Sequence, residues 1–194
     1  MPSAITPEER LQEHPQEYLA ARTKLALRRL ASAVAVLSCR DGQIRHAMTA
    51  TAVNALSMAP PSMLACVNRS TQFYRAISSA ACFAINVLHR SQIEISMGCG
   101  GKVHGDSRFH NGDWAEDTGV PILNGAQARI VCLKDATFDY GSHAIFVGRV
   151  TSIAIHGEVD PLIYVDGKYT CLPPDTVPVS ALETEIEILR QLGA

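Results

Sequence analysis

Strand-like segments dominate the sequence, and no long helical patterns separate them. Short runs rich in apolar and β-branched residues recur at positions 33–38, 43–56, 62–67, 82–87, 126–133, 144–155, 162–165 and 168–171. Because strands and long helices do not alternate, a parallel doubly wound sheet is disfavoured. Closure into a small barrel leaves no exposed strand edges and fits such segments better. We therefore predict a mainly β barrel with a few peripheral helices.

The sequence predicts four helix starts, each at a serine or threonine that can cap the helix. At three of them a glutamate follows the cap by three residues, as in a capping box. These caps are Thr6, Ser70 or Thr71, Ser91 and Ser180. Pro15 would interrupt the first helix, which resumes over 17–30, and the second would run to position 80. The third would end at Gly98, followed by an irregular functional loop over 98–124. We expect one domain, with an N-terminal helical extension (1–24) and a C-terminal tail and helix (172–194).

Composition argues against several classes of protein. The net charge of −2 gives no field that would gather nucleic acid or an anionic membrane surface. No segment approaches the roughly 20 apolar residues of a membrane span, and the N-terminus lacks the regions of a signal peptide. The six cysteines form no C-x-x-C pair, which predicts reduced thiols, no disulfide and no metal site. Together these features predict a soluble, cytoplasmic protein.

Residues 57–71, SMAPPSMLACVNRST, place a double proline before an apolar run and polar residues after it. The prolines cannot donate ladder hydrogen bonds, so Pro60 and Pro61 belong at a strand entry or edge. The polar end, 68–71, has two interpretations. It is either the cap of an ordinary helix after a core strand, or a ligand-binding loop that a barrel strand delivers.

Three patterns that suggest other chemistry do not hold. The glycine-rich segment 98–102 lacks the spacing of a dinucleotide-binding loop or a P-loop, which predicts a helix terminator and a flexible loop. Four candidate metal ligands match no strong zinc spacing, namely Cys99, His104, Asp106 and His110. Ser142 and His143 are chain neighbours without a G-x-S-x-G nucleophile elbow, so no hydrolase is indicated.

A series of short motifs occurs in a definite order along the chain. They are MTAT at 48–51, SMAPP at 57–61, CVNRS at 66–70, FAINVL at 83–88, Arg108-Phe109 with Trp114, LNGA at 123–126, HAIFVGRV at 143–150 and PLIY at 161–164. The series resembles the flavin reductase-like family, the small reductase partners of two-component flavin monooxygenases. No single motif is specific, but the ordered set covers residues 27–169.

The resemblance implies a split antiparallel β-barrel that forms a homodimer, with flavin near the subunit interface. The strand that begins at the double proline would end in the loop that holds the ribityl phosphate. Backbone N–H groups and hydroxyls of this loop would face the ligand, from Cys66, Val67, Asn68, Ser70 and Thr71. The helix that follows would add the positive end of its dipole.

The other site residues are also carried over from the family pattern. Residues 46–52 would line the isoalloxazine edge and the ribityl chain, with contacts from His46, Met48, Thr49, Ala50, Thr51 and Ala52. Arg108, followed by Phe109, would meet the phosphate. His143 would position the nicotinamide, with Tyr169 as a weaker neighbour. The chain departs from the pattern at Ser142, where the family often has an aspartate.

The activity that the resemblance implies is that of an NAD(P)H:flavin oxidoreductase. It would reduce FMN or FAD with NADH or NADPH and supply the reduced flavin to a partner flavin-dependent monooxygenase. Hydride passes between the cofactors, so no side chain need act as an acid or base. Two alternatives stay open at this point: a flavoprotein that keeps FMN as a prosthetic group for another acceptor, and a non-catalytic flavin-binding barrel subunit.

Overall fold

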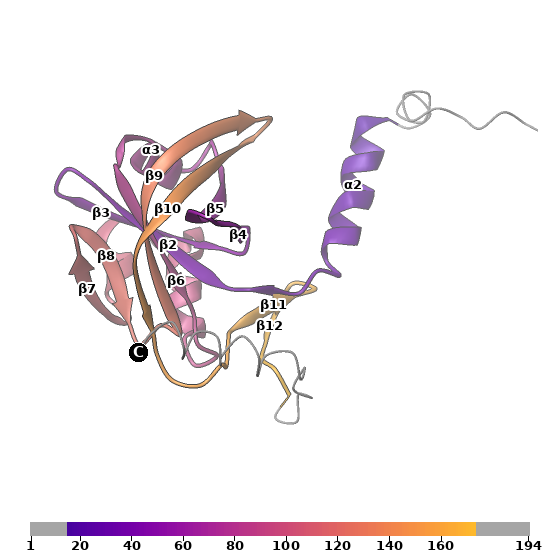
Figure 1. Cartoon of the computed structure of the whole chain (residues 1–194). Coiled ribbons are helices and arrows are strands. Elements are labelled where there is room, and N and C mark those ends of the chain that lie inside the picture. The colour runs from indigo at the N-terminus through magenta and orange to yellow at the C-terminus, as the bar shows by residue number, and fades with distance from the viewer. Residues whose placement is uncertain (1–14, 174–194) are drawn as a thin grey trace, which may run out of the picture.

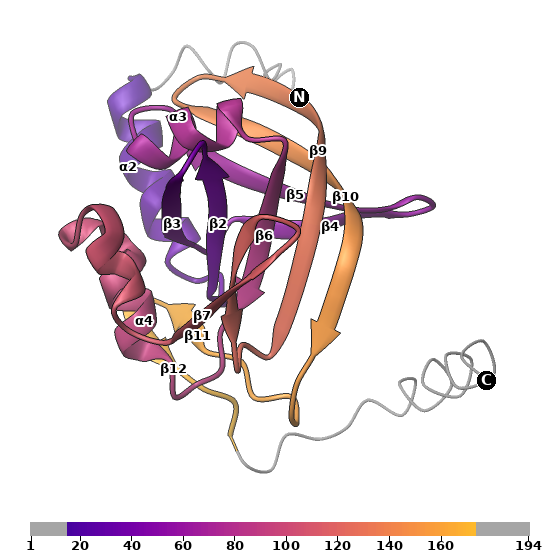
Figure 2. The same cartoon turned by 90° about the vertical axis from the view of Figure 1, so that its left-hand side faces the viewer.

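The computed structural model describes residues 15–173, which form a barrel with flanking helices (Figure 1, Figure 2). The main body is a seven-stranded sheet in the order β3-β2-β6-β9-β10-β5-β4, and each neighbouring pair is antiparallel. Its strands are β2 (Ala35–Asp41), β3 (Ile44–Ala50), β4 (Val53–Met58), β5 (Pro61–Asn68), β6 (Cys82–Val87), β9 (Ala128–Tyr140) and β10 (His143–Ile155). The predicted mainly β, antiparallel fold is confirmed.

The two edge strands of this sheet, β3 and β4, follow each other directly in the sequence. Only Thr51 and Ala52 separate them, and the Cys66 N–H on β5 donates a 2.9 Å hydrogen bond to the Ala52 carbonyl. The sheet therefore curls until its edges meet at this joint, which gives the split barrel. The prediction of one strand over 43–56 was wrong, because the chain leaves one barrel edge at Thr51 and enters the other at Val53.

The barrel interior is filled by aromatic and aliphatic side chains. The largest are each at most 2% exposed, namely Phe73, Phe83, Phe146, Leu37, Ile77 and Ile85. Gly148 of β10 lies against this core, where a Cβ atom would stand 2.7 Å from the Phe83 ring and 2.6 Å from the Cys132 Cβ. Glycine at this position lets the Phe83 ring pack directly on the β10 backbone. At the start of β5, Pro61 is the first strand residue, which confirms the predicted strand entry.

A buried polar network connects the barrel to β8 (Val120–Asn124). Asn86 Nδ2 donates to the Val36 carbonyl at 2.9 Å and to the Ser38 hydroxyl at 3.0 Å, and Asn86 Oδ1 accepts from the Leu123 N–H at 2.9 Å. The Ser38 hydroxyl in turn donates to the Pro121 carbonyl at 2.5 Å. Strands β2, β6 and β8 are thereby joined by side chains inside the protein.

The segment 98–124 is more regular than predicted. Its second half is a hairpin of β7 (Asp113–Asp117) and β8, which turns at Thr118-Gly119 with φ of 50° and 80°. Its first half holds a π-helical turn, η1 (Gly98–Lys102), and a 3-10 turn, η2 (Gly105–Phe109). The prediction of an irregular loop was wrong because acidic residues and glycine obscure the alternation of β7.

Two short helices flank the barrel. α3 (Gln72–Ser79) covers one end of it (Figure 2) and is capped by Thr71, whose hydroxyl accepts from the Tyr74 N–H at 3.1 Å. This confirms one of the two predicted caps. α4 (Ile93–Met97) begins without the predicted capping box, because the Ser91 hydroxyl bonds His89 Nδ1 at 2.8 Å instead. Nor does Gly98 end that helix, since η1 continues it.

A second, three-stranded sheet extends from one side of the barrel. In it, β1 (Ser32–Ala33) pairs with the hairpin of β11 (Ile163–Val165) and β12 (Lys168–Thr170), which has the predicted turn at Asp166-Gly167. α2 (Gln16–Leu27) precedes β1, stands beside the barrel in Figure 1 and buries none of its residues. The helix signals at Thr6 and Ser180 lie outside the described residues. Within 15–173, no helix is long and apolar enough to cross a membrane.

Candidate cofactor site

A hollow of about 470 Å³ lies beside the edge strand β3, and we refer to it as the β3 pocket. It is lined by Met48, Thr49, Thr71, Gln72, Phe73, Cys99, Gly100, Gly101, His104 and Arg108. Four of these were predicted as cofactor contacts, namely Met48, Thr49, Thr71 and Arg108. They come from three segments far apart in the sequence, and the fold brings them together around one cavity.

Arg108 is held in this pocket by backbone carbonyls. Its Nη1 donates to the Ala47 carbonyl at 2.5 Å and its Nε donates to the Val103 carbonyl at 2.7 Å. No described residue accepts a hydrogen bond from Nη2. Two of the three nitrogens therefore fix the position of the guanidinium, and the third is available to a ligand.

The same contact orients the open edge of β3. Because the Ala47 carbonyl bonds Arg108, it points away from β2, and backbone groups alternate in direction along a strand. The N–H and C=O groups of Thr49 therefore also face the open edge. The Thr49 side chain is held by a separate contact, because its hydroxyl donates to the Ser96 carbonyl at 2.6 Å.

The loop between β5 and α3 is organised by Asn68. Its Oδ1 accepts from the Ser70 N–H and from the Ser70 hydroxyl, both at 2.9 Å, and its carbonyl accepts from the Thr71 hydroxyl at 2.8 Å. Both hydroxyl donors that were predicted to face the ligand are thus engaged within the loop. The N–H groups of Gln72 and Phe73, the first two of α3, have no acceptor among the described residues. These N–H groups are the free donors that a helix start offers to an anion.

The charge of the pocket is positive. No aspartate or glutamate is among the described residues that line it. Burial raises the pKa of the Cys99 thiol to about 11, although the nearby Arg108 guanidinium lowers it, so Cys99 is an uncharged thiol at neutral pH. His46 lies on β3 just before the lining residues. Burial lowers the pKa of its imidazole, the nearby Arg108 lowers it too, and Asp41 opposes them, so this imidazole is also neutral at neutral pH. Arg108 is the permanent cation of the pocket.

A second group of predicted residues lies on the outer face of β5, β9 and β10. Residues directly opposite each other on antiparallel strands share a face. Cys66, Ile145 and Phe138 form one such row, Asn68, His143 and Tyr140 form the next, and Leu64 and Val147 belong to the same face. Phe138 and Tyr140 are 60% and 84% exposed. We call this apolar surface the outer patch: Leu64, Cys66, Phe138, Tyr140, Ile145 and Val147.

His143 is exposed at one end of the outer patch, with its Nδ1 2.9 Å from the Ser142 hydroxyl. Tyr169 lies elsewhere, on β12 in the three-stranded sheet. Its hydroxyl bonds Ser96 Oγ at 2.9 Å, and its ring packs edge to face on Tyr164 with the centroids 5.4 Å apart. The structure pairs His143 with Asn68 across β10 and β5, whereas Tyr169, its predicted weaker neighbour, lies on another sheet.

The remaining predicted residues have their side chains in the protein interior or at the barrel joint. Ala50 and Val67 are part of the core, and Phe109 is 6% exposed under the Arg45 guanidinium, 4.4 Å from the ring centroid. These three can reach a ligand only through their backbone. Thr51 and Ala52 are exposed at the joint between β3 and β4.

Sequence reasoning missed several lining residues, above all Gln72, Cys99 and His104. Gln72 follows the predicted cap Thr71, so the unpaired first turn of the helix was the signal available for it. Cys99 and His104 lie in the segment interpreted as a flexible loop, and no local pattern indicates that η1 folds back onto β3.

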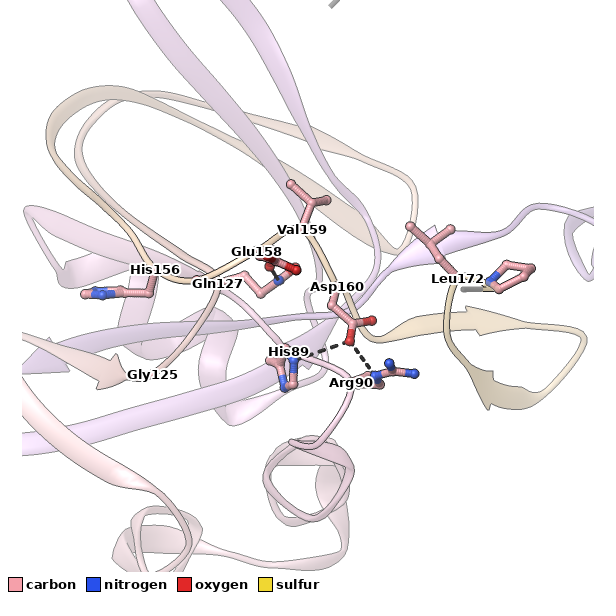
Figure 3. A pocket seen from close by; sticks show the side chains of 11 residues that line it. His89, Arg90, Gly125, Gln127, His156, Glu158, Val159, Asp160 and Leu172 are labelled. Carbon is pink, nitrogen blue, oxygen red and sulfur yellow. Dashed lines mark hydrogen bonds and ion pairs between the residues drawn. The ribbon is translucent and has the colours of Figure 1, made fainter. Parts of the chain in front are cut away.

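Another hollow, of about 460 Å³, lies away from all predicted site residues. Figure 3 shows its polar wall, where His89 and Arg90 both point to the Asp160 carboxylate. The His89 Nε2 lies 3.5 Å from Asp160 Oδ2. These contacts attach the chain after β10 to the loop before α4, so we assign them a structural role.

Solved structures of other proteins share this fold. The chain is similar to BorF, the flavin reductase component of a bacterial two-component tryptophan halogenase, with a TM-score of 0.74 and 28% identity over 79% of this chain and 98% of that one. It is also similar to a nitrilotriacetate monooxygenase component B from Mycobacterium thermoresistibile, with a TM-score of 0.78 and 25% identity over 84% and 93% of the two chains. The fold is the split barrel of flavin reductases.

The family follows from the sequence itself. The model of the flavin reductase like domain matches residues 27–173, and the chain belongs to this family. It is 38% identical to the reductase component of the FADH2-dependent resorcinol hydroxylase of Rhizobium sp. (strain MTP-10005), over 78% of this chain and 86% of that protein. It is 32% identical to the FMN reductase (NADH) RutF of Methylorubrum extorquens (strain DM4), over 90% and 86%.

Proposed function

We propose that this protein reduces FMN or FAD with NADH or NADPH and releases the reduced flavin to a partner flavin-dependent monooxygenase. The observation that carries the proposal is the β3 pocket, where Arg108 Nη2 and the N–H groups of Gln72 and Phe73 have no acceptor among residues 15–173, and where none of the described lining residues is a carboxylate. A phosphate monoester needs this combination of one cation and several N–H donors. The reductase components among the relatives support the same function.

The bound flavin supplies the hydride acceptor, and the protein contributes orientation. With the phosphate in the β3 pocket, the open edge of β3 offers backbone N–H and C=O groups to the ribityl chain and the ring. The joint at Thr51 and Ala52 would flank the ring. Cys66 would lie beside it there, because its N–H donates to the Ala52 carbonyl. His143, on the same sheet face as Cys66, would position the nicotinamide over it.

The proposal is tested by titrating flavin-free protein with FMN, FAD and riboflavin, followed by gel filtration of the mixtures. We expect saturable binding of the phosphorylated flavins with fast exchange, so that the flavin separates from the protein on the column. A flavin that stays bound through the column indicates a prosthetic group. Absence of binding at millimolar flavin contradicts the proposal.

Replacing His143 with alanine is expected to raise the KM for NADH by about 2- to 12-fold. This is the effect of losing one neutral hydrogen bond of about 0.5–1.5 kcal/mol. Turnover at saturating NADH should fall only slightly, and FMN affinity should not change. Steady-state kinetics checks this, with His110→Ala as the matched control, because His110 is an exposed histidine outside the β3 pocket and the outer patch. A fall in turnover beyond about a hundredfold at unchanged NADH affinity would instead indicate acid catalysis.

We also propose that the outer patch pairs with the same patch of a second copy, which gives a C2 homodimer. Contiguous exposed apolar surfaces of this kind mark association sites, and identical patches suit a two-fold axis. Light scattering at micromolar concentration should give about twice the chain mass of 20.9 kDa. Phe138→Asp, which puts an unpaired charge into the patch, should give the monomer mass. A monomeric wild type with full activity would refute this part of the proposal.

A further inference from the structure

A third hollow, of about 650 Å³, adjoins the barrel joint, and we call it the α2 pocket. Three segments line it: the end of α2 with the residues that follow, the joint at Thr51 and Ala52, and the turn between β11 and β12. Arg28 holds two of these walls together, because its Nε donates to Asp166 Oδ1 at 2.7 Å and its carbonyl accepts from the Asp166 N–H at 3.0 Å. The volume is that of a typical small-molecule site.

The α2 pocket and the β3 pocket lie at neighbouring positions of one stretch of chain. Thr49 lines the β3 pocket and Thr51 lines the α2 pocket. A fully extended chain rises about 3.3 Å per residue, so their Cα atoms are at most roughly 7 Å apart. With the flavin phosphate in the β3 pocket and the ring at Thr51 and Ala52, the α2 pocket adjoins the ring end of the flavin. A nicotinamide stacked on the ring therefore has the rest of its dinucleotide within reach of the α2 pocket.

The side chains of the α2 pocket suit an adenosine phosphate. The Lys24 ammonium has no hydrogen-bond or ion-pair partner among the described residues, and it lines the pocket as a free cation. Asp166, the acid at the rim, is already paired with Arg28. Tyr164 is 39% exposed, and the edge-to-face contact of its ring with Tyr169 leaves ring surface for a base to stack on. The exposed Thr51 offers a hydroxyl.

We infer that the α2 pocket binds the adenosine phosphate half of a dinucleotide. This inference rests on the proposed function, since it assigns a place to the adenosine phosphate of the NADH whose nicotinamide stacks on the flavin ring. The adenosine phosphate of FAD is joined to the phosphate in the β3 pocket, so it reaches the α2 pocket only when FAD folds back along its ring. Lys24 contacts the phosphate, and Tyr164 stacks on the adenine. Both dinucleotides carry this group, so the experiment includes an arm for each.

The test compares dinucleotides with the matching mononucleotides in Lys24→Glu and in the control Arg22→Glu, which changes a basic residue of α2 that does not line the pocket. The dissociation constants of FAD and FMN and the KM values of NADH and reduced nicotinamide mononucleotide are measured. We expect Lys24→Glu to raise the dissociation constant of FAD, the KM of NADH or both by about tenfold. The corresponding constants of both mononucleotides should stay within about twofold of wild type. A change in FAD alone assigns the pocket to the flavin, and a change in NADH alone assigns it to the nicotinamide nucleotide.

Tyr164→Leu gives a second test at a different side chain, with an expected loss of about fivefold or more for the same dinucleotide, typical of one base on an aromatic ring. Binding of ADP by calorimetry supplies a readout that does not depend on activity: wild type should bind ADP, and Lys24→Glu should bind it about tenfold more weakly. Unchanged dinucleotide values in Lys24→Glu, or equal losses for mononucleotides, would overturn the inference. If wild type binds ADP but reduces no flavin, the proposed function fails and the pocket assignment stands.

Discussion

Replacing Arg108 with alanine is expected to weaken FMN binding by roughly 1–3 kcal/mol, which is about 5- to 150-fold in the dissociation constant. The loss follows from the position of the guanidinium, which two backbone carbonyls hold in the β3 pocket with Nη2 left free. No other described side chain that lines this pocket is permanently charged. The phosphate would therefore lose its one fixed counter-charge.

Riboflavin separates a phosphate contact from an effect on folding, because it has the same ring without the phosphate. Its affinity should change by less than about twofold in Arg108→Ala. Arg75→Ala, an exposed arginine on α3 that does not line the pocket, is the matched control. Arg108→Lys keeps the charge but loses the planar fork, so an intermediate FMN affinity is expected. Equal losses of FMN and riboflavin would show that Arg108 acts on the ring site or on the fold.

Replacing Asn86 with alanine is expected to lower the free energy of unfolding by about 3 kcal/mol or more. The change leaves the Leu123 N–H and the Val36 carbonyl buried without their side-chain partner and opens a cavity in the core. Each buried polar group left unsatisfied costs about 1–3 kcal/mol. Urea unfolding, followed by circular dichroism, measures the difference.

Asn54→Ala is the control for Asn86, since Asn54 is an exposed asparagine on β4 and should change the unfolding free energy by less than about 0.5 kcal/mol. Flavin affinity of folded Asn86→Ala should stay close to wild type, because Asn86 lies in the interior behind β2 and not in the β3 pocket. A loss of stability below about 1 kcal/mol would mean that water or a rearranged side chain satisfies the network.

Much of the fold was predictable because its signals are local. The strands at 62–67 and 82–87, the Thr71 cap, the strand entry at Pro61 and the Asp166-Gly167 turn all depend on a few neighbouring residues. The division of 43–56 into two strands on opposite edges was not predictable, because no glycine or proline marks the bend at Thr51. Only closure of the barrel, a contact between distant strands, decides where one edge strand ends and the next begins.

The site was predictable only where the family pattern names residues. Met48, Thr49, Thr71 and Arg108 meet in one pocket, which spacing alone would not indicate because α3, β6, α4 and η1 lie between Thr71 and Arg108. Cys99 and His104 were missed because η1 continues α4 beyond a glycine that normally ends a helix. The hydroxyls of Ser70 and Thr71 were expected to bind a ligand, but Asn68 engages both, which is visible only from side-chain positions.

The most direct test of the central claim is NADH oxidation by purified, flavin-stripped protein, measured with and without added FMN or FAD. We expect no oxidation without flavin, and a rate that saturates with flavin concentration when either flavin is added, with one reduced flavin formed for each NADH consumed under anaerobic conditions. Oxidation of NADH by a second acceptor without free flavin, or no oxidation with either flavin, would contradict the account.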